Sequence, residues 1–175
     1  QFHLSLQSGS DAVLKSMNRH YTSREYLDKC ALIYKYFPSA AITTDVIAGF
    51  ATESDENFEA SLSVIEKAGF ARVHAFAFSP REGTVAYRLK DISPEVKSAR
   101  LHRLLIAAEK TSDRYISRFI GKESEFIAEE TEGGFVTGYT GNYIKIYLSD
   151  KVKTGEKYKI ILTERYGEGA LAKLV

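Results

Sequence analysis

The sequence predicts an incomplete parallel α/β barrel over residues 1–121, followed by a small antiparallel β-barrel over residues 122–175. Three observations lead to this prediction. Strand-like and helix-like segments alternate over the first two-thirds of the chain, which is typical of parallel strands joined by crossover helices. One long amphipathic helix follows. After Gly121 the pattern changes to short alternating strands separated by Gly, Asn and Asp turns, which favours a small barrel.

Capping and breaker residues set the expected bounds of the α/β elements. Strands are expected at residues 2–7, 40–50 and 71–80, and helices at residues 10–17, 22–37, 54–69 and 93–122. Thr22 and Glu25 have the spacing of a capping box, Gly69 ends a helix, and Ser93 caps the long helix. Three parallel strands cannot close a barrel of eight. We therefore expect the chain to start partway round a barrel, with an exposed sheet edge that invites homo-association.

The bulk composition excludes several kinds of protein. The 175 residues are 44% hydrophobic and 27% charged, with a net charge of +1, so overall charge points to no particular partner. The single cysteine, Cys30, cannot form an intramolecular disulfide or hold a zinc ion or iron–sulfur cluster alone. Within its amphipathic helix we expect Cys30 to be buried and inert. No apolar run reaches the roughly 18 residues of a membrane span.

Small polar and charged residues follow each of the three expected strands, at QSGS (7–10), AGFATES (48–54) and FSPREGT (78–84). Because ligands bind at the carboxyl ends of parallel strands, these segments predict one site. QSGS either binds an anion at a helix N-terminus or is a plain capped turn. Asp45 either pairs within the fold or binds a ligand hydroxyl or amine, and Arg81 either holds a carboxylate or phosphate or makes a surface salt bridge. We expect His74 to be a hydrogen-bonded core residue.

Basic residues are concentrated in the long helix. Residues 90–122 hold eight Lys or Arg against four Asp or Glu, whereas the residues after Lys122 hold seven against nine. Five of the basic residues fall within one quadrant of the helix at about 100° per residue. This stripe is either a solvated face or a track for phosphates, and aromatic residues of the small barrel either stack on bases or fill its core. The candidate RNA-binding residues are Arg100, Arg103, Lys110, Arg114, Arg118, Tyr139 and Tyr143.

Four ordered motifs carry a resemblance to a known family. The chain reads HL..QSGS from residue 3, VLK.MNR.YT from residue 13, TDVI.GF from residue 44 and FSPR.GT from residue 78. Together they resemble the radical S-adenosylmethionine methylthiotransferases. GYTGNYIKIYL (138–148) resembles the signature of the TRAM barrel that ends members of that family. HLSLQSGSD (3–11) and AAITTDVI (40–47) are most similar to the branch acting on threonylcarbamoyladenosine beside a tRNA anticodon.

The resemblance implies a tRNA-modifying enzyme of the cytoplasm that uses S-adenosylmethionine and [4Fe–4S] clusters. Cluster-bound S-adenosylmethionine would be cleaved to a deoxyadenosyl radical, and a methylthio group would replace the hydrogen at C2 of the adenine. Sulfur would come through a second cluster. Carried over by position, the cofactor-binding residues are Gln7, Ser8, Gly9, Ser10, Asp45, Ile47, Gly49, Ser79 and Arg81. The catalytic residues are not assigned. The cluster-binding cysteines of the family have no counterpart here, so this chain alone is expected to be inactive.

One motif departs from the family pattern, and two other functions stay open. The family sequence GFPGET reads GFATES (49–54) in this chain. The exchange of Pro and Gly makes the loop less preset and adds a β-carbon near the expected cofactor, which bears on cofactor affinity. The alternatives are a methylthiotransferase for isopentenyladenosine in tRNA and a non-catalytic RNA-binding module built on the long helix and small barrel.

Overall fold

The computed structural model describes residues 1–175, which divide into one unit of Phe2–Ser112 and another of Asp113–Val175 with Gln1. The division lies inside the long helix, whereas the sequence suggested a boundary after Gly121. The last helical turns group with the barrel because their side chains contact it, as when the Tyr115 hydroxyl donates to a barrel carbonyl at 2.9 Å.

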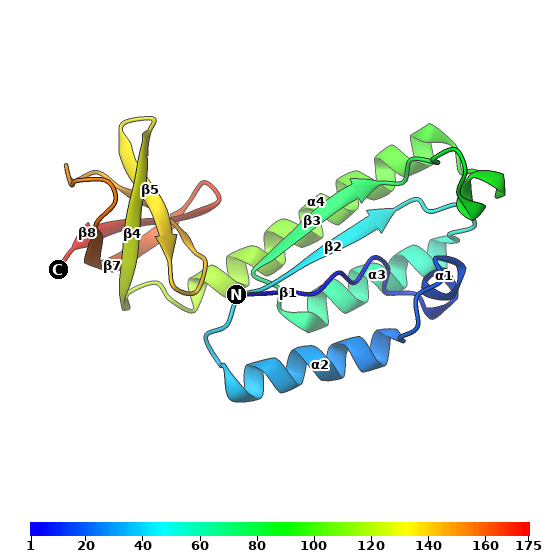
Figure 1. The fold of residues 1–175 in the computed structure, drawn as a ribbon, viewed down its shortest axis with the longest axis horizontal. Helices are drawn as coiled ribbons and strands as arrows, with labels where there is room; N and C mark the ends of the chain where they lie inside the picture. The colour runs from blue at the N-terminus through cyan, green and yellow to red at the C-terminus, as the bar shows by residue number, and fades with distance from the viewer. The chain divides into compact units, whose positions relative to one another are not determined.

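The α/β unit is a three-stranded parallel sheet in the order β1–β2–β3 with helices packed on one face (Figure 1). Its elements in chain order are β1 (Phe2–His3), α1 (Asp11–Ser16), α2 (Ser23–Tyr36), β2 (Ile42–Ala48), α3 (Asp55–Ala68), β3 (Arg72–Ala77), the 3₁₀ helix η1 (Val85–Arg88) and α4 (Pro94–Ser117). The predicted partial parallel barrel with three βα units and a long helix is confirmed.

Local sequence signals explain where these helices begin and end. The Ser10 side chain caps α1, and the Ser54 side chain caps α3. Thr22 and Glu25 form the predicted capping box at the start of α2, with each side chain bonded to the other's backbone N–H. Gly69 ends α3 at φ +67°, a left-handed conformation that favours glycine.

β1 is much shorter than the strand predicted over residues 2–7. Its regular ladder with β2 stops at His3 and returns only as a single bridge at Gln7, because side chains take backbone groups between these residues. The Leu6 N–H donates to Thr44 Oγ1 at 2.9 Å, and the Tyr26 hydroxyl donates to the Leu4 carbonyl at 2.6 Å. The β1 edge of the regular sheet is therefore two residues long, whereas β3 at the other edge has six residues, and homo-association through an exposed edge stays a prediction.

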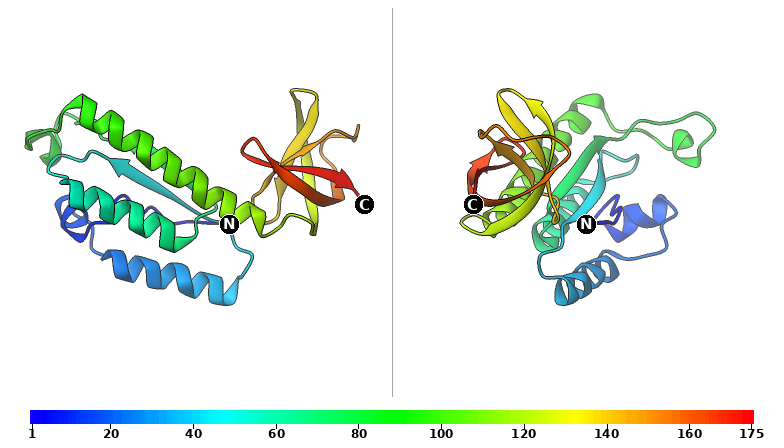
Figure 2. Two further views of the ribbon diagram at one scale, coloured as in Figure 1. Left: turned by 180° about the vertical axis from the view of Figure 1, so that it is seen from behind. Right: turned by 60° about the vertical axis from the view of Figure 1, so that its left-hand side comes forward.

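The alternation of β2 gives the sheet two different faces. Its residues Ile42, Val46 and Ala48 are buried against α2, α3 and α4 in one hydrophobic cluster, whose largest fully buried members include Phe58 and Phe70. The intervening residues point to the opposite face, which no α-helix of the chain covers (Figure 2). The uncovered face is where the candidate site lies.

α4 ends at Ser117, about a turn earlier than the predicted helix over 93–122. The N–H groups of Arg118 and Phe119 donate to carbonyls three residues back, so the helix tightens into turns. Leu105 was expected on the apolar stripe of this helix, but it is 49% exposed, which corrects that assignment. α4 is the longest helix, and neither it nor any other helix combines the length and apolar character needed to cross a bilayer.

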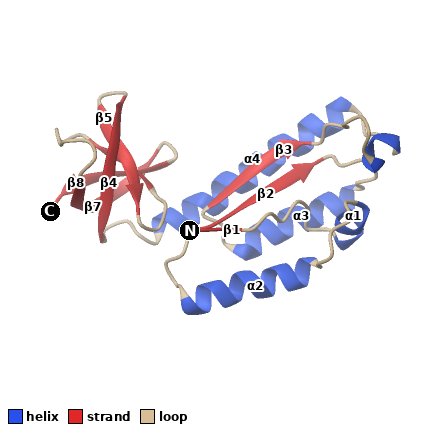
Figure 3. Ribbon diagram, viewed as in Figure 1, coloured by secondary structure: helices blue, strands red, loops and turns tan.

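The second unit contains a closed five-stranded barrel (Figure 3). Its strands are β4 (Glu123–Glu132), β5 (Phe135–Thr140), β6 (Lys145–Leu148), β7 (Lys157–Tyr166) and β8 (Gly169–Leu174), in the order β4–β5–β6–β8–β7. Four of the five strand pairs are antiparallel, but β6 and β8 are parallel. The expected barrel is confirmed, and its wholly antiparallel character is wrong at this pair, because β8 turns back from β7 and closes on β6.

Closure of the barrel depends on two glycines. A β-carbon at Gly138 of β5 would overlap the carbonyl oxygen of Ile127, and one at Gly169 would overlap that of Lys145. Both clashes are with backbone, which cannot rotate away as a side chain can. The sequence therefore has glycine where neighbouring strands approach too closely for any side chain.

We expect Gly138→Ala to lower the free energy of unfolding by about 3 kcal/mol, the upper part of the usual range for overpacking. Urea unfolding followed by circular dichroism measures this change. Gly141→Ala is the matched control, because no atom lies within 4 Å of its added β-carbon, and it should be near neutral. Equal midpoints for the two variants would contradict the close approach at Gly138.

Candidate functional site

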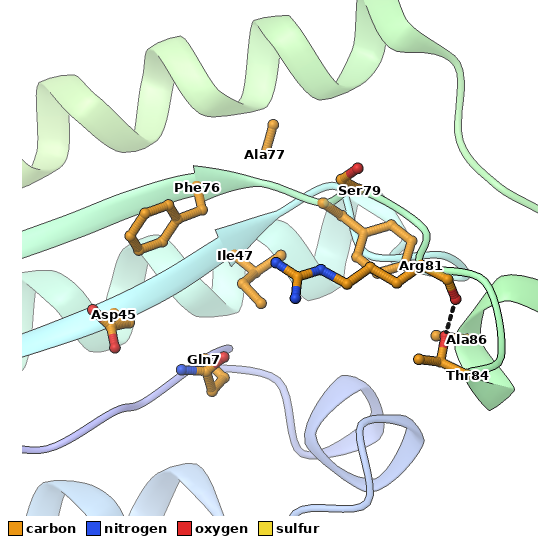
Figure 4. Close-up of a pocket in the computed structure, with 10 residues that line it drawn as sticks. Gln7, Asp45, Ile47, Phe76, Ala77, Ser79, Arg81, Thr84 and Ala86 are labelled. Atoms are coloured by element: carbon orange, nitrogen blue, oxygen red, sulfur yellow. Dashed lines mark hydrogen bonds between the residues drawn. The ribbon is translucent and has the colours of Figure 1, made fainter.

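A cavity of about 480 Å³ lies on the uncovered face, toward the carboxyl ends of β2 and β3 (Figure 4). This volume is within the range of small-ligand sites. Its lining residues are Gln7, Asp45, Ile47, Phe76, Ala77, Phe78, Ser79, Arg81, Thr84 and Ala86. Five of the nine cofactor residues expected from the sequence are thus brought together: Gln7, Asp45, Ile47, Ser79 and Arg81.

Asp45 of β2 is held by two side chains of the neighbouring N-terminal segment, His3 of β1 and Ser5 just after it. Its Oδ2 accepts a hydrogen bond from Ser5 Oγ at 3.0 Å and lies 3.1 Å from His3 Nε2. The other ring nitrogen of His3, Nδ1, lies 2.9 Å from Thr43 Oγ1. Both bonds converge on one carboxylate oxygen, which leaves Oδ1 available to a ligand hydroxyl or amine. Asp45 therefore both pairs within the fold and lines the cavity.

Gln7 adopts a left-handed backbone conformation, with φ +67°. Its N–H donates to the Asp45 carbonyl and its own carbonyl accepts from the Ile47 N–H, so the conformation is fixed by bonds to β2 on both sides. A left-handed conformation is costly for a residue with a β-carbon. Such strain is concentrated at functional positions, and here it accompanies an amide side chain at the cavity.

Arg81 supplies positive charge at the other end of the cavity. Its guanidinium is directed into the cavity on the side of Ile47 (Figure 4). The Arg81 carbonyl accepts a bond from Thr84 Oγ1 at 2.7 Å, which orders the turn that carries the arginine. Phe76 and Phe78 also line the cavity, so it offers a carboxylate, a guanidinium and aromatic rings to a ligand that has an aromatic base, a cation and a carboxylate.

Ser8, Gly9 and Ser10 face α3 instead of the cavity. Ser8 is fully buried with its hydroxyl 3.3 Å from Ser61 Oγ, and the Gly9 N–H donates to the same atom at 2.9 Å. A β-carbon at Gly9 would lie 2.6 Å from the Ser61 Cα. The QSGS segment is therefore a tight packing turn on α3, and only Gln7 of its four residues reaches the cavity.

The loop after β2 contains two residues in the left-handed backbone conformation, Gly49 and Thr52. Gly49, the first residue after the strand, has φ +74° and does not line the cavity. Thr52 has φ +77°, although a β-branched residue is rarely left-handed. Thr52 occupies the position of the second glycine in the family sequence GFPGET. The exchange therefore adds local strain in this loop.

Arg100 corrects the predicted basic stripe. Its side chain is 8% exposed and pairs with Glu53 at 2.8 Å and with Asp55 at 2.7 Å. A buried guanidinium with two carboxylate partners cannot present itself to a phosphate backbone. The helical wheel placed it on the stripe because sequence spacing does not reveal acidic partners on another segment.

The other basic residues of the stripe lie near or on the surface. Arg103 is about half exposed, pairs with Glu59 at 2.7 Å and stacks over Phe58, whereas Lys110 is exposed. In the barrel unit, Arg114 is exposed, and Arg118 lies over the Tyr115 and Phe119 rings.

Several aromatic side chains lie on the outside of the barrel, whereas Phe126 is fully buried in its core. The rings of Tyr139 and Tyr143 stack at 4.9 Å and 17°. Phe135, Tyr147 and Tyr166 form a neighbouring cluster with ring centroids 5.0–6.0 Å apart. Tyr143 and Tyr166 are exposed. Rings on an outer surface are available to stack on bases.

Cys30 and His74 lie outside the proposed site, and the structure shows whether each is buried as expected. Cys30 is buried, as expected, and burial raises the pKa of its thiol to about 11. His74 was expected in the core, but it lies half-buried on the uncovered face, with its ring 6.2 Å from that of His3.

The chain contains no cluster of three or more His, Cys, Asp or Glu able to hold a metal. A [4Fe–4S] cluster therefore does not fit the residues of this chain.

Comparison with known proteins adds to this geometry. Residues 1–65 match the model of the Radical SAM superfamily. Over 94% of its length the chain is 42% identical to a tRNA-2-methylthio-N(6)-dimethylallyladenosine synthase of Thermodesulfovibrio yellowstonii. Over 97% it is 38% identical to the threonylcarbamoyladenosine tRNA methylthiotransferase MtaB of Thermotoga maritima. The chain belongs to the radical SAM methylthiotransferase family. It spans 39% of the length of each of these two relatives.

Several residues of the candidate site were missed from the sequence. Phe76 and Phe78 line the cavity, and Ser5 and His3 hold Asp45. The two phenylalanines share the strand parity of His74, and this alternation was a usable signal. The bonds to Asp45 depend on the pairing of β1 with β2, which no local pattern gives.

We expect Thr52→Gly to raise the free energy of unfolding by about 1 kcal/mol, because glycine removes the left-handed penalty of a side chain. Urea unfolding of the two proteins measures the difference. Thr52→Ala is the control, since alanine keeps the β-carbon and should give no comparable gain. Equal gains from Gly and Ala would show that the strain is not the cause.

Proposed function

We propose that this chain forms part of a tRNA methylthiotransferase that adds a methylthio group at C2 of threonylcarbamoyladenosine next to the anticodon. The observation that carries the proposal is the cavity at the strand ends, in a chain similar over almost its whole length to tRNA methylthiotransferases. The cytoplasmic location expected from the sequence follows from the tRNA substrate.

The residues of the cavity fit S-adenosylmethionine. Asp45 Oδ1 would accept from a hydroxyl or the amino group, Arg81 would pair with the carboxylate, and Ile47, Phe76 and Phe78 would contact the adenine. When bound, the cofactor supplies radical chemistry and the methyl group. The chain's own contribution is to bind and orient it. Because no iron–sulfur ligands are present here, we expect this chain by itself to be inactive.

A second nucleoside remains a candidate. The HLSLQSGSD and AAITTDVI motifs favour threonylcarbamoyladenosine, whereas the 42% identical relative is named for dimethylallyladenosine. Dimethylallyladenosine is another name for isopentenyladenosine, the substrate in the alternative hypothesis. Both reactions would use the same cavity, so the difference between them must lie in contacts with the base to be modified.

Mass spectrometry of tRNA from a strain lacking the parent gene distinguishes the two nucleosides. We expect the methylthio form of threonylcarbamoyladenosine to disappear while its precursor accumulates, and complementation to restore it. Loss of only the methylthio form of isopentenyladenosine would support the alternative. If both modifications persist, the proposed activity is wrong.

A non-catalytic RNA-binding module is the candidate from a different class. It is favoured by the exposed basic residues Arg103, Lys110 and Arg114 and by the stacked Tyr139–Tyr143 pair, which need no cofactor to bind RNA. The two functions are compatible in one protein, because the same contacts would hold tRNA during modification.

We expect the chain to bind tRNA with an affinity that falls as salt rises, since phosphate contacts release counterions. Replacing Arg103, Lys110 and Arg114 by Gln should reduce the slope of log K against log salt by roughly 2. Replacing Lys15, Lys35 and Lys67, which are exposed on α1, α2 and α3, removes the same charge and should change the slope little. Equal effects of the two triple variants would eliminate the stripe as a tRNA contact.

A further inference from the structure

The first turns of α4 contain two cations, Lys97 and Arg100, whose side chains are only 12% and 8% exposed. They stand one helical turn apart and reach the ends of two different strands. We propose that Lys97 and Arg100 are positioning residues that fix the carboxyl ends of β2 and β3 relative to each other and so shape the wall of the cavity. The proposal rests on the proposed function only for the identity of the ligand.

Arg100 holds the end of β2 through Glu53. One guanidinium nitrogen, Nη1, donates to Glu53 Oε2 at 2.8 Å and to the Glu53 carbonyl at 3.0 Å. The same Oε2 accepts the N–H of Gly49 at 2.8 Å, directly after β2. Burial raises the pKa of Glu53, whereas the Gly49 N–H and Arg100 oppose this shift. The strand end is thus joined to α4 by two short bonds in series.

Lys97 holds the end of β3. Its Nζ donates to the Phe78 carbonyl at 3.2 Å and to Asp91 at 2.6 Å, and it lies 5.2 Å from the centre of the Phe78 ring. Its stem also packs on Gly49, where a β-carbon would approach Lys97 Cγ to 2.6 Å. Lys97 therefore touches both strand ends, and the absence of a side chain at Gly49 permits it.

The two strand ends meet at one aromatic contact. Phe50 and Phe78 pack edge to face with centroids 4.8 Å apart, and the Phe78 N–H donates to the Ala48 carbonyl at 2.9 Å. Phe78 itself lines the cavity. A shift of α4 at Lys97 or Arg100 is therefore transmitted to a ring that lines the cavity.

The hydrogen-bonding groups of the buried Glu53–Arg100 ion pair are not all satisfied, so stabilisation alone does not explain the pair. Glu53 Oε1 and Arg100 Nε are buried without a hydrogen-bond partner. Incompletely satisfied buried ion pairs cost desolvation energy that a hydrophobic pair would avoid, so they are weak evidence for stabilisation. Their directional bonds do fix geometry, which agrees with a positioning role.

Lys97→Met tests the proposal, because methionine keeps the packing stem and removes the ammonium donor. We expect this variant to weaken S-adenosylmethionine binding about tenfold, the effect of losing one charge-assisted bond, with the melting temperature changed by less than about 2 °C. Lys97→Arg should restore most of the affinity. Lys157→Met is the matched control, since it removes a lysine–carboxylate pair of 3.0 Å on β7, and it should leave binding unchanged.

Amide hydrogen exchange at Phe78 provides a readout that needs no ligand. We expect Lys97→Met to speed this exchange about tenfold through local opening and Lys97→Arg to leave it slow. If the wild-type chain binds no S-adenosylmethionine, the proposed cofactor site is wrong, while the exchange rates still decide the positioning role. Unchanged exchange at Phe78 in Lys97→Met overturns the positioning role, whatever the binding result.

Arg100 is tested with a paired replacement, because Arg100→Gln alone leaves Glu53 buried without its cation and could unfold the chain. The double variant Glu53→Gln/Arg100→Gln removes both charges. We expect it to fold and to show faster exchange at Gly49 than the wild type. If the Gly49 amide of this folded variant exchanges at the wild-type rate, Arg100 is not a positioning residue.

Discussion

The pairing of β2 with β1 and β3 is the constraint on which the α/β unit depends. Successive side chains of a strand point to opposite faces, so one register decides the core and the site together. Val46 and Ala48 fill the core, while Asp45 and Ile47 line the cavity between them in sequence. A shift by one residue would bury the carboxylate and expose the core. The site is therefore as well determined as the hydrophobic packing.

Much of this arrangement could be predicted from the sequence, because its signals are local. The capping box at Thr22, the left-handed Gly69 and the change of period after Gly121 each act within a few residues. The convergence of the strand ends also followed, since parallel strands share an edge. The role of the QSGS motif was harder to predict, because sequence alone does not show that Ser8 and Gly9 turn toward Ser61 on α3.

What could not be predicted depends on partners distant in sequence. Arg100 fits the basic stripe by helical spacing, and only the fold reveals Glu53 and Asp55 beside it. The parallel pairing of β6 with β8 likewise depends on how the barrel closes. Periodicity predicts which face of a helix or strand a residue occupies, but it does not predict which side chains of other elements pack against that face. The residues that were wrongly assigned from the sequence are accordingly those whose role depends on another element.

Two of the three left-handed non-glycine residues of the α/β unit illustrate how strain and function are related. Gln7 and Thr52 both adopt left-handed conformations despite having side chains. Gln7 lines the cavity and its amide can bond a ligand, so glycine there would relieve strain and lose a contact. Thr52 is exposed and does not line this cavity, so no contact there accompanies its strain. Strain alone therefore does not mark a functional residue; what distinguishes Gln7 is that its side chain also reaches the cavity.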